Sequence, residues 1–345
     1  MGKGVYKAME KRPKAVLVDG KRGGQSMPVA EETGELAKCG ADFVVAGCSC
    51  EADLIEHAAD ADAILTYGAQ MTRSVMEKLP NCKVIVRYGI GYDTIDVDAA
   101  TDNNILVVNI PDFCIEEVSN HAIALILACS KKIVTLNNVL KRDGWGQAVS
   151  MQSPMASIYG QTLGIIGCGN IGRATARKAH CFGFKLIGYD PYVDKSLAKE
   201  AGISPVNMAE LLGESDYISV HTVLNSETRH LVGAEEFKQM KPTAYFINTS
   251  RGAVVDEPAL ITALREKRIA GAALDVFEKE PVDPENPLLK MDNVIVLPHT
   301  ASFSDDAFRR LRTCVGQEAA RVLSGRWPKN VVNKDVKPKI DLKRE

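Results

Sequence analysis

The sequence predicts an α/β protein with two lobes, each built on a parallel sheet. Short runs rich in β-branched residues alternate with stretches of helical periodicity, which is the pattern of parallel strands joined by crossover helices. The alternation occurs in two series, and the second begins near residue 162. A chain of 345 residues is also long enough for two domains.

The first series is expected to supply one sheet. Its strands are short apolar runs, and their ranges are 15–20, 42–47, 63–68, 83–89 and 105–109. A long helical stretch follows from about Glu116 to Arg142, because apolar residues recur there at helical spacing and Gly144 closes the run. This stretch separates the first series from the second.

The second series is expected to supply the other sheet. Its strands are 162–167, 184–190, 217–222, 244–250, 271–277 and 293–299. The helices between them include 171–182, 208–213, 235–239 and 257–267. A final helix is expected after Ala301 to about Leu323, and the Lys- and Pro-rich tail from Trp327 is expected to fray.

Composition and charge argue against several classes of protein. The chain has 42 basic and 44 acidic residues, a formal net charge of −2, whereas a general nucleic-acid binder needs a basic excess. No apolar run approaches the ~20 residues that span a bilayer, so we expect no membrane partner. The first residues lack the apolar segment of a secretory signal, so we expect no export.

The cysteines indicate the compartment. Their number, nine, is odd, and several stand inside apolar runs, which is typical of reduced, buried thiols in a cytoplasmic protein. Cys48 and Cys50 form a C-x-C pair without a second pair at zinc spacing. We therefore expect a cytoplasmic protein without a metal site.

A glycine-rich turn predicts a dinucleotide site. The turn follows the apolar strand 162–167, opens a helix, and reads Gly167-Cys168-Gly169-Asn170-Ile171-Gly172. Gly167 permits the tight turn, Gly169 lets the backbone approach a pyrophosphate, and Gly172 lets the helix lie close on the strand. The helix N-terminus then attracts the phosphates. Asp190 ends the next strand, where it can bind ribose hydroxyls and repel a 2′-phosphate, which favours NAD.

Three polar residues at strand ends are candidates for the chemistry. Arg251, Glu280 and His299 follow the strands 244–250, 271–277 and 293–299, so they belong to the carboxyl edge where such sheets bind ligands. A guanidinium grips a carboxylate through two hydrogen bonds, and an imidazole exchanges a proton near neutral pH. A carboxylate beside the ring favours its protonated form. Spacing alone leaves Glu278 as an alternative partner for the histidine.

The order of these motifs resembles the D-isomer-specific 2-hydroxyacid dehydrogenases. In chain order they are G-x-G-x-x-G, an acid, S-R-G, D-x-F-E-x-E-P and P-H-x-A, within roughly residues 60 to 315. The resemblance implies two Rossmann-like lobes, with the cofactor domain inserted into a discontinuous substrate domain. It implies an NAD-binding domain over 119–301 and a flavodoxin-like substrate domain over 1–118 and 302–345.

The resemblance also implies roles in catalysis. Arg251 would orient the substrate and His299 would be the acid/base. Glu280 rather than Glu278 would pair with the histidine, because the family glutamate directly precedes proline, here Pro281.

Binding residues follow from the same resemblance. Substrate contacts would come from Tyr67, the backbone of Ile90 and Gly91, and again Arg251 and His299. The cofactor contacts would be Gly167, Gly169, Asn170, Ile171, Gly172, Asp190, His221, Thr228, Thr249, Asp275 and His299. Asp275 matches the family position that binds the nicotinamide amide, and His221 is expected to be structural rather than a second catalyst.

The implied function is NAD-dependent interconversion of a short 2-oxo acid and its D-2-hydroxy acid by a homodimer. Trp145 stands in a pattern that the family places near the dimer contact. The substrates expected are glyoxylate, hydroxypyruvate or a short aliphatic 2-oxo acid.

Two alternatives remain open at this stage. Phosphoglycerate dehydrogenases commonly have Arg-Ser after the strand segment that corresponds to 63–66, whereas this chain has Tyr67-Gly68-Ala69-Gln70 there, so a phosphate would need Arg73 or Arg309. C-terminal-binding-protein corepressors share the motif set, so a NAD-sensing binding protein is the second alternative. Turnover of any 2-oxo acid with NADH would support an enzyme.

Overall fold

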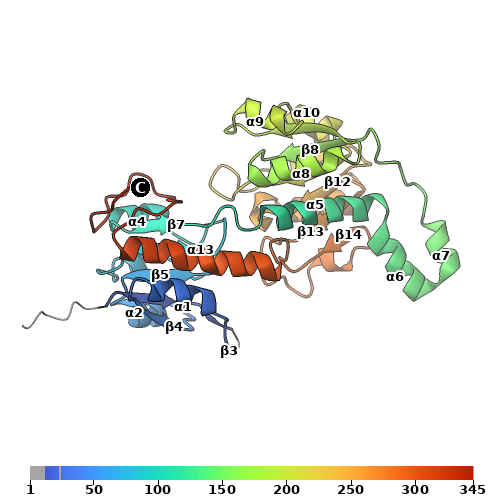
Figure 1. Ribbon diagram of the computed structural model, residues 1–345. Coiled ribbons are helices and arrows are strands. Elements are labelled where there is room, and N and C mark those ends of the chain that lie inside the picture. Colours follow the sequence, from blue (N-terminus) through green and yellow to red (C-terminus); the bar gives the residue numbers. More distant parts are fainter. Residues whose placement is uncertain (1–11, 23–24, 345) are drawn as a thin grey trace, which may run out of the picture. The chain divides into compact units, whose positions relative to one another are not determined.

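The computed structural model describes residues 12–22 and 25–344 (Figure 1). The chain forms two compact units, one of Met1–Phe113 with Asp305–Glu345 and one of Cys114–Ser304. Each unit is a parallel sheet covered by helices, so the predicted α/β fold is confirmed. Residues 1–11, which bear on the expected absence of a signal and open the expected domain 1–118, lie outside the described residues, as does residue 345.

The sheet of the first unit has the strand order β4-β1-β5-β6-β7. Its neighbouring strands are all parallel. The chain passes from β1 to β4 on one side and then to β5 on the other, so the strand order reverses between β1 and β5. Ligands bind such sheets outside the carboxyl ends of the strands at this reversal. The strands are β1 (Lys14–Leu17), β4 (Asp42–Val45), β5 (Ala63–Thr66), β6 (Val84–Arg87) and β7 (Leu106–Val108).

Helices cover both faces of this sheet. One face packs on α2 (Glu51–Ala58), α3 (Arg73–Met76) and α4 (Val97–Asp102) through a core that includes Ile64 and Ile85. The other carries α1 (Ala30–Ala37) and α13 (Asp305–Leu323), which contact each other closely. A short antiparallel pair, β2 (Lys21–Arg22) and β3 (Gln25–Ser26), completes the elements of the unit.

The C-terminal tail is bonded to the sheet, so the expectation that it frays was wrong. Val331 forms an isolated bridge with Val108, and the side chain of Asn333 accepts a hydrogen bond from the Val107 amide at 2.9 Å. Asn333 is buried and also donates to the Ile105 carbonyl at 2.9 Å. A backbone bridge and a buried side-chain amide thus anchor a segment whose composition is that of a loose tail.

The sheet of the second unit has the order β10-β9-β8-β11-β12-β13-β14, and its strands are parallel throughout. All carboxyl ends therefore lie along one edge. β11 and β13 are buried along their whole length, as expected for strands covered on both faces. The strands are β8 (Thr162–Ile166), β9 (Lys185–Tyr189), β10 (Ser204–Pro205), β11 (Tyr217–Val220), β12 (Tyr245–Asn248), β13 (Gly271–Leu274) and β14 (Val294–Val296).

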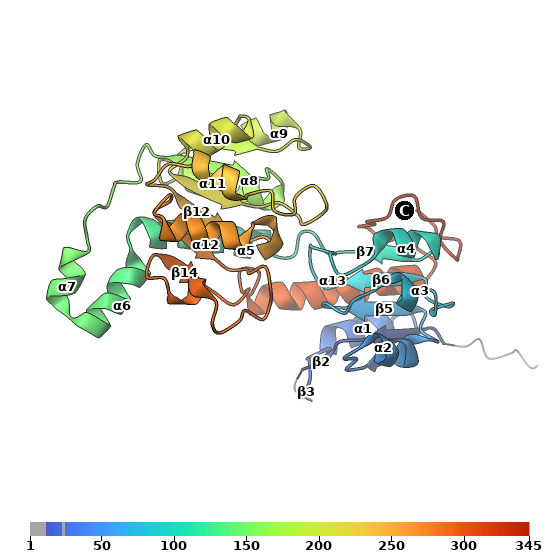
Figure 2. The same cartoon turned by 180° about the vertical axis from the view of Figure 1, so that it is seen from behind.

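Two separate cores flank this sheet. On one face, α5 (Ile115–Ser130) and α8 (Asn170–His180) pack on each other and on the strands (Figure 1). The opposite face, seen in Figure 2, carries α10 (Met208–Glu214), α11 (Ala234–Gln239) and α12 (Glu257–Arg265). The remaining short helices are α9 (Lys195–Glu200), η1 (Gly252–Val254) and η2 (Pro287–Lys290).

The long helical stretch is broken. α5 ends at Ser130, and α6 (Ile133–Asp143) begins after Lys132, whose φ is +49°. Eight residues of α5 are buried, but only Val139 is buried in α6. The apolar residues at helical spacing therefore continue into α6, although most of α6 does not pack on the core. A further short helix, α7 (Trp145–Ser150), follows. Among the described residues no single helix has the length and apolarity to span a membrane, although α5 and α6, bent by 54°, meet that test as a pair.

Candidate active site

The glycine-rich turn after β8 has the shape that a dinucleotide needs. Gly167 has a φ of +93°, and a Cβ there would lie 2.8 Å from the backbone of His221. A Cβ on Gly172 would overlap the carbonyl oxygen of Gly167, whereas a Cβ on Gly169 would meet no atom within 4 Å. Gly172 therefore permits the close approach of α8, and Gly169 keeps the outer face of the turn open. The amides at the start of α8, Asn170 and Ile171, belong to the same turn.

Asp190 is fixed beside this turn. Its carboxylate accepts hydrogen bonds from the amides of Cys168 at 2.8 Å, Tyr192 at 2.9 Å and Val193 at 3.0 Å. The end of β9 is thereby tied to the glycine-rich turn. Burial, and secondarily the charge of Asp190, raises the pKa of Cys168 to about 12, so this thiol stays protonated.

Arg173 is a residue that the sequence analysis missed. Its guanidinium donates to the Cys168 carbonyl at 2.7 Å and to Asn170 Oδ1 at 2.8 Å, so a positive charge lies against the turn. A cation directly after the last glycine of the motif was the available signal. This charge and the α8 N-terminus both favour an anionic ligand.

The other residues expected at the cofactor occupy strand ends and loops of the same unit. Burial lowers the pKa of His221 to about 4, and its Nε2 lies 2.9 Å from Ser219 Oγ, so it is a neutral, structural imidazole at neutral pH. Thr228 Oγ1 donates to the Val223 carbonyl at 2.6 Å within its loop. Thr249 is 7% exposed, and its Oγ1 has no hydrogen-bond partner among the described residues. A buried hydroxyl without a partner at the carboxyl edge of the sheet is suited to a hydrogen bond with a bound cofactor.

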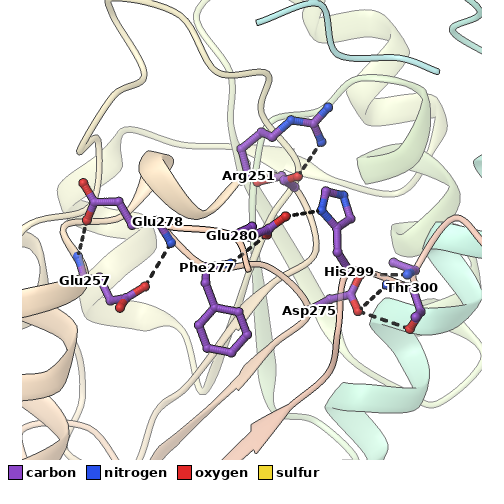
Figure 3. A network of polar contacts seen from close by, with 10 residues as sticks. Arg251, Glu257, Asp275, Phe277, Glu278, Glu280, His299 and Thr300 are labelled. Atoms are coloured by element: carbon purple, nitrogen blue, oxygen red, sulfur yellow. Dashed lines mark hydrogen bonds and ion pairs between the residues drawn. The ribbon is translucent and has the colours of Figure 1, made fainter. Parts of the chain in front are cut away.

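His299 and Glu280 form a hydrogen-bonded pair (Figure 3). Glu280 Oε2 lies 2.7 Å from His299 Nδ1, and Oε1 accepts the Phe277 amide at 3.0 Å. Burial acts to raise the pKa of Glu280, but the hydrogen bonds from His299 and Phe277 and the charge of Arg251 outweigh it and lower the pKa. The carboxylate is therefore ionised at neutral pH and faces the imidazole.

Glu278, the alternative partner, points elsewhere. Its Oε1 lies 2.6 Å from His230 Nε2. Its amide donates to Glu257 Oε2 at 2.9 Å (Figure 3). The choice that spacing left open between Glu278 and Glu280 is decided by this local geometry.

Asp275 clamps the segment that carries His299. Its carbonyl accepts the His299 amide at 2.7 Å, and its fully buried carboxylate accepts the amides of Thr300 at 2.9 Å and Ala301 at 2.7 Å (Figure 3). His299 has a φ of +56°, an uncommon conformation for a residue with a side chain. Three hydrogen bonds that one aspartate accepts thus define where the imidazole lies. His121 Nε2 lies 3.6 Å from the same carboxylate.

Arg251 joins the pair from the end of β12. Its Nη1 donates to the Ser250 carbonyl at 2.9 Å, and its charge contributes to the lowered pKa of Glu280. A Cβ on the next residue, Gly252, would overlap the backbone of Phe277, so the two loops lie in contact. The fold therefore brings together a guanidinium, an imidazole and a carboxylate, which can bind an acid and exchange a proton.

The expected substrate residues of the first unit also lie at a carboxyl edge. Tyr67 follows β5, and its ring stacks on Tyr88 after β6 with centroids 3.9 Å apart. The carbonyl of Ile90 accepts Asn109 Nδ2 at 2.7 Å, which fixes the loop that continues to Gly91. These residues belong to the first unit, whereas the catalytic candidates belong to the second.

Sequence comparison identifies the family. The profile of the D-isomer-specific 2-hydroxyacid dehydrogenase NAD-binding domain matches residues 123–301. A glyoxylate reductase of Korarchaeum cryptofilum is 39% identical over 285 residues, which are 82% of this chain and 86% of that protein. A D-3-phosphoglycerate dehydrogenase of Methanocaldococcus jannaschii is 40% identical over 310 residues, which are 89% of this chain but 57% of that protein.

Solved structures agree with this result. A glyoxylate reductase from Paecilomyes thermophila has a TM-score of 0.83 at 26% identity, covering 94% of this chain and 99% of that one. A glyoxylate/hydroxypyruvate reductase from Sinorhizobium meliloti, in complex with NADP and malonate, has a TM-score of 0.82 at 28% identity, covering 96% and 100%. An Aquifex aeolicus D-lactate dehydrogenase with NAD and lactic acid has a TM-score of 0.80 at 28% identity, covering 92% and 99%. The chain belongs to the D-isomer-specific 2-hydroxyacid dehydrogenase family, and it is an oxidoreductase that acts on CH–OH groups and contains the family's NAD-binding domain.

Proposed function

We propose that this enzyme reduces a short, unphosphorylated 2-oxo acid such as glyoxylate or hydroxypyruvate to its D-2-hydroxy acid with NADH. The observation that carries the proposal is the hydrogen bond of 2.7 Å between His299 and Glu280, with Arg251 beside it. We also propose a substrate domain over 1–118 and 302–345 and an NAD-binding domain over 119–301, with Arg251, Glu280 and His299 in the NAD-binding domain.

Each side chain of the site has one task. Arg251 binds the substrate carboxylate. The backbone amides of Ile90 and Gly91 are the substrate contacts proposed for the first unit. When bound, the nicotinamide supplies the hydride that C2 accepts. His299, protonated at Nε2, donates that proton to the carbonyl oxygen, while Glu280 stabilises the imidazolium through Nδ1. The reverse reaction returns the proton to the same nitrogen.

Cofactor binding is assigned to the turn 167–172, Asp190, His221, Thr228, Thr249, Asp275 and His299. Arg173 is added to this set because its charge lies against the turn. Asp190 would place a negative charge near a 2′-phosphate, so we expect NADH to be preferred over NADPH. Related structures contain either NAD or NADP, so the family alone does not decide which cofactor is preferred. We base the preference on Asp190 of this chain.

The cations available for a substrate phosphate are engaged in ion pairs. Arg73 Nη1 lies 2.8 Å from Asp102 Oδ2, and Arg309 Nη1 lies 2.8 Å from Asp306 Oδ1. A phosphate dianion in a site without such donors would lose charge-assisted hydrogen bonds of about 1.5–3 kcal/mol each. This favours an unphosphorylated substrate over 3-phosphohydroxypyruvate, the substrate that the 40% identical dehydrogenase suggests.

We also propose a cytoplasmic homodimer. All nine cysteines are free, including the buried Cys82 and Cys129, which fits a reducing compartment. α6 and α7 expose apolar side chains that a second copy would cover, namely Ile133 at 56%, Leu140 at 43%, Trp145 at 75% and Val149 at 45%.

The test is a substrate screen that follows absorbance of the reduced cofactor. We expect the highest kcat/KM with glyoxylate or hydroxypyruvate and NADH, and a lower value with NADPH or with 3-phosphohydroxypyruvate. A clear lead for the phosphorylated compound would assign the enzyme to 3-phosphoglycerate oxidation instead. Binding of NADH without turnover of any 2-oxo acid would favour a NAD-sensing binding protein.

A further inference from the structure

At the strand reversal of the first sheet, a carboxylate of the protein accepts hydrogen bonds from several backbone amides. Asp19 follows β1, and its side chain accepts hydrogen bonds from the amides of Tyr67 at 2.9 Å, Gly68 at 2.6 Å and Ala69 at 2.9 Å. It also accepts Thr66 Oγ1 at 3.1 Å. Successive amides that converge on one point form the concave site at which proteins bind anions. Here the anion is supplied by the chain itself.

The position of this contact links it to the substrate. β1 and β5 are neighbours, and the strand order reverses between them, so Asp19 and residues 67–69 stand where an open α/β sheet binds its ligand. Tyr67 stacks on Tyr88, which begins the loop that leads to Ile90. The amides held by Asp19 therefore border the loop to which substrate binding is assigned.

Two cations of this unit are paired with carboxylates other than Asp19. Arg312 interacts electrostatically with Tyr67, but its Nε lies 2.9 Å from Glu31 Oε2 and its Nη2 3.4 Å from Glu31 Oε1. Arg73 is paired with Asp102. Arg87, at the end of β6, donates to the Tyr88 carbonyl. A second anionic group on a substrate that approaches these amides would therefore meet the carboxylate of Asp19.

We propose that Asp19 determines specificity by filling these amides and rejecting 2-oxo acids that carry a second anionic group, whether a phosphate or a further carboxylate. The inference rests on the proposed function, because it deepens the preference for monoanionic substrates. Glyoxylate and hydroxypyruvate carry one carboxylate, which Arg251 binds. A second anion would have to displace Asp19 from its hydrogen bonds or lie next to a like charge, an arrangement by which binding sites suppress wrong ligands.

The test compares Asp19→Asn and Asp19→Ala with the unmodified enzyme. We expect the ratio of kcat/KM for hydroxypyruvate to that for 3-phosphohydroxypyruvate to fall by about 10- to 100-fold in both variants, and the ratio of pyruvate to oxaloacetate to fall likewise. kcat/KM for glyoxylate is measured in both variants to show that they fold and turn over a monoanionic substrate. Asp19→Asn keeps an acceptor oxygen for the amides, so it carries the test if Asp19→Ala does not fold.

A matched control removes one carboxylate from the same unit. Glu51→Gln loses the same charge, and Glu51 bonds Thr72 and Ser74 rather than the amides. We expect its substrate ratios to equal those of the unmodified enzyme. Unchanged ratios in Asp19→Asn with full glyoxylate turnover, or an equal change in Glu51→Gln, would overturn the proposal.

A second readout needs no turnover. Inorganic phosphate should raise the melting temperature of Asp19→Ala, because the freed amides bind it, and should leave the unmodified enzyme and Glu51→Gln unaffected. The same response in all three proteins would show that the amides select no anion and would overturn the role of Asp19. Failure of the proposed function looks different, since the unmodified enzyme would then turn over no unphosphorylated 2-oxo acid.

Discussion

His299 has an uncommon backbone conformation, and its position is fixed by two hydrogen-bond partners, Asp275 and Glu280. Asp275 holds its backbone amide, and Glu280 lies 2.7 Å from its Nδ1, so Nε2 is the ring nitrogen to which we assign proton exchange with the substrate. A substitution that keeps a polar side chain but cannot carry a proton therefore isolates the acid/base role.

His299→Gln should lower kcat by about 10² or more, as expected for the loss of a general acid. The dissociation constant of NADH, measured by fluorescence titration, should change little, because the turn 167–172 and Asp190 are untouched. His230→Gln is the matched control, since His230 pairs with Glu278 rather than with Glu280. Near-full activity of His299→Gln would refute the assigned mechanism.

Glu280→Gln should move the pH profile of reduction to lower pH. The pKa of Glu280 is lowered, so its carboxylate is charged at neutral pH and favours the protonated imidazole that reduction requires. Without that charge the imidazolium loses its proton at lower pH, and the rate falls earlier as pH rises. The measurement is kcat/KM for glyoxylate between about pH 5 and pH 9, a range that brackets histidine titration.

Glu278→Gln provides the comparison for that experiment. Its carboxylate bonds His230 and Glu257, so its profile should match that of the unmodified enzyme. An equal displacement of both profiles would point to general electrostatics rather than to the Glu280–His299 pair.

At the scale of elements, the contact between β8 and α8 decides whether the cofactor turn can form. Two of the three glycines in this turn, Gly169 and Gly172, face different surroundings. A side chain at Gly172 would overlap the protein's own backbone, and a side chain at Gly169 would meet only open space. The same substitution at the two positions therefore separates folding from ligand binding.

Gly172→Ala should destabilise the fold by about 1–3 kcal/mol, as for other overpacked sites, and weaken NADH binding as α8 moves away. Gly169→Ala should keep the melting temperature of the unmodified enzyme and weaken NADH binding about 10-fold or more, because a methyl group would block the approach of a pyrophosphate. Thermal melts and NADH titrations on both variants check this. A stable Gly172→Ala variant with normal NADH affinity would contradict the packing argument.

At the scale of the whole molecule, the proposed dimer explains the exposed apolar side chains of α6 and α7. Trp145 is 75% exposed, and Val149 one turn later is 45% exposed. Surfaces of this kind are covered by a partner in most oligomeric proteins.

The protein should elute and scatter light as a dimer, and the double variant Trp145→Asp, Val149→Asp should be a monomer, because two carboxylates would be buried at the contact. Tyr159→Asp is the control, since Tyr159 is 82% exposed but lies outside α6 and α7. A monomeric unmodified protein would reject the homodimer.

The sequence by itself determined the α/β class and the residues of the glycine-rich turn, because periodicity and glycine spacing are local properties of a chain. It also placed Arg251, Glu280 and His299 near strand ends, since each comes within three residues of the end of an expected strand. What it left out depends on contacts between distant segments. The end of α5 at Ser130 reflects where the sheet surface stops, and the order of the C-terminal tail rests on the burial of Asn333.

Tertiary structure alone decided which polar groups face each other. Glu278 and Glu280 are two residues apart, and only the path of the loop directs one to His230 and the other to His299. Asp19 is separated by 48 residues from the first amide that it binds, and a single aspartate after a strand carries no local signal of that partner. Hydrogen bonds between loops depend on the order of the strands in the sheet, which sequence periodicity does not encode. The position of the Asp19 carboxylate at the edge of the first sheet could therefore be known only from the tertiary structure.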